Sequence, residues 1–213
     1  MPLATWITFV IAGALIAVSP GSGAVLSMSH GLAYGVRKAS ATVLGLQLGL
    51  LLVFAIAGAG VGSLLIASET AFNVVKTVGA LYLIYLGVQQ WRARVDPASG
   101  TAAAVPLAQP SLAKRVATGF LTNATNPKGI IFMVAVLPQF ISQQLPLLPQ
   151  LVILGATMLV IDTVVMHGYA WLASSMQRFF RDAGAVRKQN RFFGAVLMLM
   201  GGALFFVRRG NPT

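Results

Sequence analysis

The sequence predicts an all-α, polytopic membrane protein of six transmembrane helices, arranged as two inverted repeats of three helices each. The first observation is composition: of 213 residues, 57% are hydrophobic and only 9% are charged, which is typical of a membrane protein rather than a soluble domain. The second is that long uncharged runs alternate with short basic segments. The third is that proline and glycine interrupt the first apolar run of each half of the chain.

The first half contains three apolar runs of the length that a bilayer-spanning helix needs. The predicted helices cover about residues 6–28, 39–68 and 73–91. Pro20 interrupts the first of them because it has no backbone N–H, and Gly21 and Gly23 weaken the helix further. An unpaired backbone group is costly in hydrocarbon, so this break predicts either a packed kink or a polar cavity.

The second half follows a linker rich in alanine and proline, residues 95–111. The predicted helices beyond it cover about residues 116–137, after Lys114 and Arg115, then 150–172 and 192–207. Pro127 and Gly129 interrupt the first of these within a polar stretch. We therefore expect one transmembrane domain over residues 1–213, with one repeat over about 1–94 and a second over about 112–213.

The two interruptions occupy corresponding positions in the two halves. Because each half holds three helices, the halves enter the membrane in opposite directions. Paired breaks in inverted halves point to a transporter site near the middle of the membrane. The alternative interpretation is that Pro20 and Pro127 are packing kinks only.

Asp162, Lys128 and Gln47 are polar side chains inside the predicted helices. Asp162 is close to the centre of its run, where a carboxylate costs on the order of 3 kcal/mol or more and is a functional candidate by default. Its roles stay open: it binds a substrate ammonium, carries a proton, or pairs with Lys128 in the second break. Gln47 lies between Gly45 and Gly49, whose spacing predicts close helix packing, and its amide must find a polar partner.

The charged residues set the expected orientation and partners. The net charge is +11, but the basic residues lie in short segments between apolar runs, which indicates membrane topology and not nucleic-acid binding. Their distribution predicts both termini on the non-cytoplasmic side, although Arg208 and Arg209 argue against this. With no cysteine and four acidic residues, we expect neither a metal site nor a cofactor.

Two rival functions remain on the residues alone. Ser22, within Pro-Gly-Ser-Gly, and His167 would be the nucleophile and base of an intramembrane serine hydrolase. No further acid or histidine is placed by the sequence to support that pair, so we expect a protein that is not an enzyme. The second rival is a non-transporting membrane subunit or a channel.

The sequence also resembles the LysE/RhtB family of amino-acid exporters, and within it the homoserine/homoserine lactone group. The resemblance covers nearly the whole chain. It rests on Ser-Pro-Gly-Ser-Gly-Ala (19–24), Gly-Leu-Gln-Leu-Gly-Leu (45–50), Ala-Leu-Tyr-Leu-Ile-Tyr-Leu-Gly-Val-Gln-Gln-Trp-Arg-Ala (80–93), Leu-Thr-Asn-Ala-Thr-Asn-Pro-Lys-Gly (121–129), Pro-Gln-Phe-Ile (138–141) and Asp162 with Gly-Tyr-Ala (168–170). Two positions depart from the usual patterns. Ser22 replaces the second proline of the wider family, and Ala124 stands where the group's pattern has leucine.

The resemblance implies a secondary transporter in the bacterial inner membrane. It would export small neutral amino acids or derivatives, with homoserine, homoserine lactone and threonine as candidates, and would be driven by the proton gradient. Its partners would be this small substrate, protons and the bilayer; assembly into a homo-oligomer stays open.

A zwitterionic substrate needs both an anion and a cation in its site. The first turn after a break offers free N–H groups to a carboxylate, while Asp162 or the free carbonyls before the first break offer acceptors to an ammonium. Asp162 is also the candidate for proton coupling. The expected substrate-binding residues are Ser22, Gln47, Asn123, Asn126, Lys128, Asp162 and Tyr169, and the expected backbone residues of the breaks are Pro20, Gly21, Gly23, Pro127 and Gly129.

Overall fold

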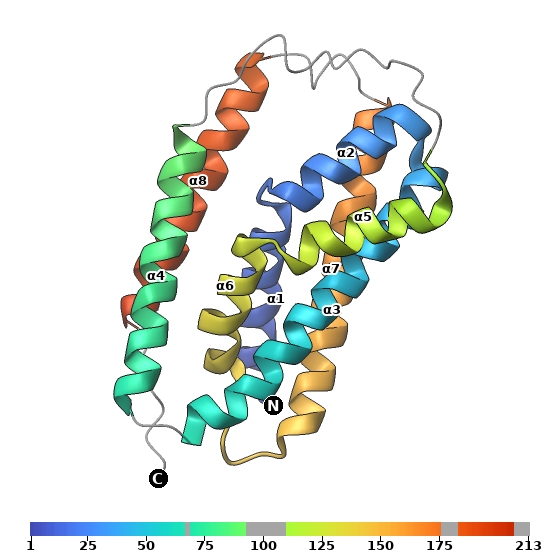
Figure 1. Cartoon of the computed structure of the whole chain (residues 1–213). Helices are drawn as coiled ribbons and strands as arrows, with labels where there is room; N and C mark the ends of the chain where they lie inside the picture. Colours follow the sequence, from blue (N-terminus) through green and yellow to red (C-terminus); the bar gives the residue numbers. More distant parts are fainter. Residues whose placement is uncertain (67–68, 93–109, 176–182, 207–213) are drawn as a thin grey trace.

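The computed structural model describes residues 1–66, 69–92, 110–175 and 183–206. Within these ranges every regular element is a helix, which confirms the all-α class (Figure 1). The elements are α1 (Leu3–Val18), α2 (Ser22–Tyr34), α3 (Val36–Ile66), α4 (Glu69–Trp91), α5 (Leu112–Ala124), α6 (Pro127–Val136), the 3₁₀ helix η2 (Leu137–Phe140), α7 (Leu147–Ser175) and α8 (Ala183–Phe206).

Both predicted interruptions are present. The axes of α1 and α2 differ by 57°, and those of α5 and the α6–η2 segment by 49°. Pro20 lies between α1 and α2, where the missing N–H ends the first helix. Pro127 takes the first position of α6, which suits its fixed φ, and the Asn126 side chain caps that helix by accepting from the Lys128 N–H at 3.1 Å.

The helices differ in how well each could cross a bilayer alone. Val36–Gly60 of α3 and the whole of α7 are long and apolar enough, and each bent pair passes the same test when taken as one span. The apolar parts of α4 and α8 are shorter, Thr77–Gln89 and Gly194–Ala203. One expectation was wrong: α8 begins at Ala183, so basic residues that we assigned to the preceding loop lie in its first turns.

The two halves of the chain are joined by pairs of helices, one from each half, that pack closely against each other. Figure 1 shows α4 beside α8 and α3 beside α5, and α2 packs on α7. Glycine makes these approaches close: a Cβ at Gly45 would overlap the backbone of Val116, and Gly87 and Gly194 face each other's carbonyls. The small-residue packing predicted for Gly45 and Gly49 is therefore confirmed, and its partner is α5.

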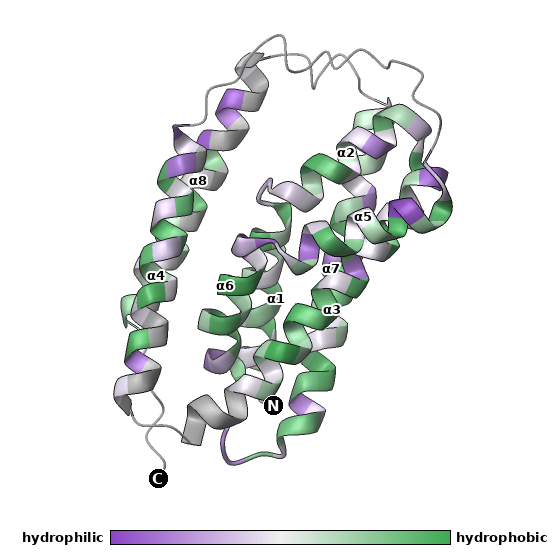
Figure 2. Cartoon of the chain, viewed as in Figure 1, coloured by the Kyte–Doolittle hydropathy of each residue, from purple (hydrophilic) through white to green (hydrophobic). Residues whose placement is uncertain are grey.

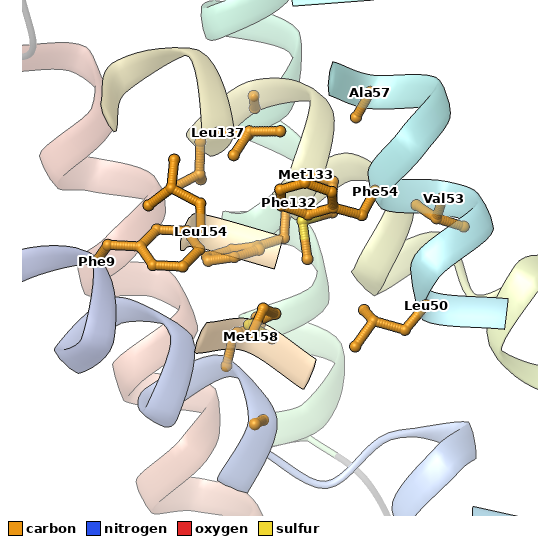
Figure 3. Packing of buried hydrophobic residues seen from close by; sticks show 14 of the residues in the cluster. Phe9, Leu50, Val53, Phe54, Ala57, Phe132, Met133, Leu137, Leu154 and Met158 are labelled. Atoms are coloured by element: carbon orange, nitrogen blue, oxygen red, sulfur yellow. The ribbon is translucent and has the colours of Figure 1, made fainter. Parts of the chain in front are cut away.

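The main apolar core lies between α1, α3, α6 and α7. Figure 3 shows Phe9 of α1 beside Leu154 of α7, and Phe54 of α3 beside Met133 of α6. Phe9 also meets Phe140 edge to face, with ring centroids 5.1 Å apart. The first bent pair packs on α7 and the second packs on α3, and because α3 also packs on α7, the two breaks are fixed relative to each other.

One amide fastens the connection before α7. The Gln150 side chain is buried, and its Nε2 donates to the carbonyls of Ser142, Leu145 and Pro146 at 3.0, 3.1 and 3.1 Å. Its Oε1 accepts from the Ser142 N–H at 2.8 Å. The connection is therefore a fixed part of the fold at the end of the molecule opposite the basic segments of α3 and α5.

The outer surface of the helices is apolar. Ile56, Leu81 and Val164 are each more than half exposed on α3, α4 and α7, as expected of side chains that contact lipid. Figure 2 shows hydrophilic residues gathered at the beginnings of α3, α5 and α8, and again at the junction of α5 and α6. The chain is thus an all-helical polytopic membrane protein with polar groups at mid-height.

Candidate functional site

The two helix breaks meet, and Lys128 joins them. Its Nζ donates to the carbonyl of Ile16 at 3.1 Å and to that of Ser19 at 2.5 Å. The last carbonyls of α1 have no partner in their own helix because the chain leaves the helical path at Pro20. They also form the negative end of the helix dipole, which attracts a cation.

The second break is fastened to α3 through two asparagines. Asn123 donates from Nδ2 to the Leu46 carbonyl at 2.8 Å. Asn126 donates from Nδ2 to Asn123 Oδ1 at 3.4 Å while its own Oδ1 caps α6. The positive end of α6 is therefore held next to the middle of α3, with Lys128 as its second residue.

Asp162 is buried at the middle of α7, with 7% of its surface exposed. Gln47 finds its polar partner there: its Nε2 donates to Asp162 Oδ2 at 2.8 Å. The other end of this amide, Gln47 Oε1, is buried and accepts no hydrogen bond from the described part of the chain. A buried oxygen that accepts no hydrogen bond is uncommon in proteins.

Lys128 and Asp162 face one cavity, but within the described residues they form no direct ion pair. The two charges are close enough to interact electrostatically across it. The site thus holds one cation and one carboxylate, each with its own hydrogen-bond partners. A solute between them would meet both.

The cavity is small in this conformation. It offers about 40 Å³ to the centres of water-sized spheres, which is room for roughly three waters at about 10–15 Å³ each. Methionines and Phe132 make its apolar wall. The residues that line it are Ile16, Ala17, Ser19, Gly21, Gly23, Ala24, Leu50, Asn123, Asn126, Lys128, Gly129, Phe132, Met133, Met158, Asp162 and Met166.

Tyr169 lies beside the cavity rather than in its wall. Its hydroxyl donates to the Val18 carbonyl at 2.6 Å, one residue before the α1 break. Tyr169 is one of the buried residues of α7. It therefore helps hold the end of α1 in place.

Ser22 is not brought into the cavity. It is the first residue of α2, and its side chain is exposed. His167 bonds elsewhere, through Nδ1 to the Thr163 carbonyl at 2.9 Å and through Nε2 to Ser40 Oγ at 3.1 Å. The nucleophile–base pair that the hydrolase alternative requires is therefore not assembled here.

Sequence reasoning missed the apolar wall and the particular carbonyls that Lys128 contacts. Helical spacing places Met166, four residues after Asp162, on the same face of the helix, and the same spacing could have placed Met158, four residues before it. The only sequence signal for the carbonyls of Ile16 and Ser19 was the nearby Pro20, which has no N–H to donate to the preceding turn.

A family model and several relatives match this chain. The model, described as "LysE type translocator", matches residues 14–208. An uncharacterized membrane protein of Vibrio cholerae is 38% identical over 201 residues, covering 94% of this chain and 96% of the relative. A homoserine/homoserine lactone efflux protein of Salmonella typhimurium is 40% identical over 204 residues, covering 95% and 97%. A leucine efflux protein of Klebsiella pneumoniae is 31% identical over 136 residues, covering 64% and 63%. No solved structure gives a significant match.

Proposed function

The chain belongs to the LysE translocator family, and from that premise we propose that it exports small neutral amino acids or their derivatives. Relatives named as homoserine/homoserine lactone and leucine efflux proteins support this substrate class. Homoserine and its lactone are the leading candidates, because the relatives with that name align over nearly the whole chain. Threonine, which also carries a hydroxyl, is the next to test.

The charge balance of the cavity is the observation that carries the proposal. Asp162 and Lys128 are the two charged side chains in its described wall, so the empty site has no net charge. A zwitterion or a neutral solute leaves that balance intact, whereas a basic amino acid adds a charge that no second carboxylate in this wall offsets. An uncompensated buried charge is costly, and the site therefore selects neutral solutes.

We propose six membrane crossings in two inverted repeats over about 1–94 and 112–213, joined by the linker 95–111. The support is that each half opens with a bent pair, and Figure 1 shows the two pairs running in opposite directions. The repeats would rock against each other to open the site to either side in turn. The small cavity supports such a motion, because an amino acid of homoserine's size needs more room than roughly three waters.

The proposed setting is the bacterial inner membrane, with both termini on the non-cytoplasmic side. The basic residues of α3 and α5 support this orientation. Arg115 Nη1 donates to the Lys38 carbonyl at 2.7 Å, so the beginnings of these two helices lie at one end of the molecule, which the positive-inside rule assigns to the cytoplasm. Proton coupling would use Asp162, the buried carboxylate of the cavity.

Flux through purified protein in lipid vesicles tests the function. We expect transport of homoserine, homoserine lactone or threonine that depends on a proton gradient, and none of lysine. Asp162→Asn, which removes the carboxylate at almost constant volume, should lower this flux at least about tenfold, or about 1.4 kcal/mol. Glu69→Gln, at the first position of α4, is the matched loss of an acid on another helix and should keep the flux. Equal flux through the Asp162→Asn and unaltered proteins would make Asp162 structural, and flux of lysine alone would refute the substrate class.

A further inference from the structure

We propose that the end of α1 is a binding subsite for a primary ammonium group, and that Lys128 occupies it in place of the substrate when the site is empty. This inference rests on the proposed function, because it assigns the part of the cavity that would hold the substrate's amino group. The subsite consists of the Ile16 and Ser19 carbonyls on one side and the Asp162 carboxylate across the cavity.

The contacts of Lys128 show what this subsite accepts. Nζ donates two of its three N–H groups to main-chain carbonyls, at 3.1 and 2.5 Å, and makes no further hydrogen bond within the described residues. The remaining donor is left for the cavity. A lysine ammonium and the ammonium of an amino acid are the same chemical group, R–NH₃⁺, with three donors and one charge. Carbonyls that bind the lysine ammonium therefore have the geometry and polarity to bind the ammonium of an amino acid.

Gly21 provides the space for this ammonium. A Cβ added at Gly21 would lie 3.1 Å from Lys128 Nζ and 3.2 Å from its Cε. Even a methyl group there would require the ammonium to shift by a few tenths of an ångström. Glycine at this position therefore leaves room for an ammonium beside the break.

The substrate would enter by exchange. Its ammonium takes the two carbonyls of α1, and the flexible stem of Lys128 moves the lysine ammonium away from them. In an α-amino acid the carboxylate is attached to the carbon that carries the nitrogen, so the displaced Lys128 ammonium meets it within the same cavity. The charge of the site stays balanced before and after the exchange. A free primary amine is then required of every substrate.

The absence of cysteine from the chain allows a direct test. Lys128→Cys creates a single thiol in the subsite and removes the resident cation. We expect this variant to bind propylammonium, an ammonium without a carboxylate, at least about tenfold more tightly than the unaltered protein, because a competitor that fills the subsite for nine-tenths of the time lowers the apparent affinity tenfold. Isothermal titration calorimetry on detergent-purified protein measures this affinity. Tetramethylammonium, which has the charge but no N–H donor, should not bind.

Chemical modification of the same thiol provides the control. Treatment with 2-aminoethyl methanethiosulfonate attaches a disulfide-linked primary ammonium, which should restore the weak propylammonium binding of the unaltered protein. Methyl methanethiosulfonate attaches an uncharged group and should leave binding tight. Lys114→Cys, an exposed lysine in the first turn of α5, should bind like the unaltered protein in all three forms.

Equal propylammonium affinity in the unaltered, Lys128→Cys and methyl-capped proteins would overturn the subsite. If Lys128→Cys does not fold, Lys128→Met replaces the stem without the charge, and the unaltered protein offers a further measurement: N-acetylation of homoserine should abolish binding, and retained binding contradicts the inference. These are equilibrium measurements, so their failure leaves export in vesicles standing. Absence of flux would likewise leave the ammonium subsite standing.

Discussion

Replacing Gln47 with leucine separates what this amide does for stability from what it does for the site. The change removes the donor to Asp162 Oδ2, at 2.8 Å, and a hydrogen bond to a charged group contributes about 1.5–3 kcal/mol. It also removes the buried Oε1 that has no partner among the described residues, which recovers about 1–3 kcal/mol. The two effects nearly cancel. We expect the free energy of unfolding to change by only about 1 kcal/mol, or about 2–4 °C in Tm.

Transport should respond differently, because Asp162 loses the group that orients it toward the cavity. We expect flux in vesicles to fall about tenfold, equivalent to about 1.4 kcal/mol, while Tm, followed by the fluorescence of the three tryptophans, stays nearly constant. Gln139→Leu is the control, since among the described residues its amide bonds within its own segment, from Nε2 to the Ala135 carbonyl at 3.3 Å. The reasoning would be refuted if flux were unchanged and Tm fell by 10 °C or more, a loss of unfolding free energy on the order of 3 kcal/mol. Gln47 would then stabilise the fold without a role in transport.

Three further changes test contacts that hold the fold and the site in place. Gly31→Ala should lower the free energy of unfolding by about 1–3 kcal/mol, because its Cβ would overlap the backbone of α7. Gly168→Ala is the control and should be neutral, because there is open space around Gly168. Equal Tm values for the two variants would contradict the close approach of α2 to α7. Gln150→Ala should cost about 1–3 kcal/mol, since it removes the hydrogen bonds that fasten the connection before α7, whereas the exposed Gln143 should tolerate alanine in the same thermal assay. Tyr169→Phe should reduce flux severalfold with little loss of stability, because it removes the hydrogen bond to the Val18 carbonyl at the end of α1. Unchanged flux would show that this hydroxyl does not position the end of the helix.

The helix breaks and the close packing were predictable because each depends on the chemistry of single residues. Proline cannot donate to the preceding turn, so Pro20 and Pro127 mark the breaks wherever the surrounding helices lie. Glycine spacing likewise identifies a packing face without naming its partner, and Gly45 could have met any helix. The inference that Gln47 needed a partner followed from the cost of a buried amide; that the partner is Asp162 required the structure.

Other features depend on angles that no residue pattern contains. The 57° bend between α1 and α2 decides the direction in which Ser22 points, and it points outward. Every residue has a carbonyl, so no pattern of side chains singles out Ile16 and Ser19 as acceptors for Lys128. The start of α8 was missed because a run of arginine, lysine and asparagine is typical of a loop, although basic residues are also compatible with a helix that leaves the membrane.

The glycine contacts between the halves have a consequence for biosynthesis. Gly87 of α4 is covered by Gly194 of α8, which leaves the ribosome roughly 100 residues later, or about 5–20 s at the usual rate of translation. During that interval the first three helices expose main chain at their glycine positions, where the later helices will pack. The insertion machinery or lipid must cover this exposed main chain. The nascent chain is most prone to misassembly at that stage. A chain cut within the linker should still yield transporter if both pieces are made together, because each piece supplies the other's missing surface.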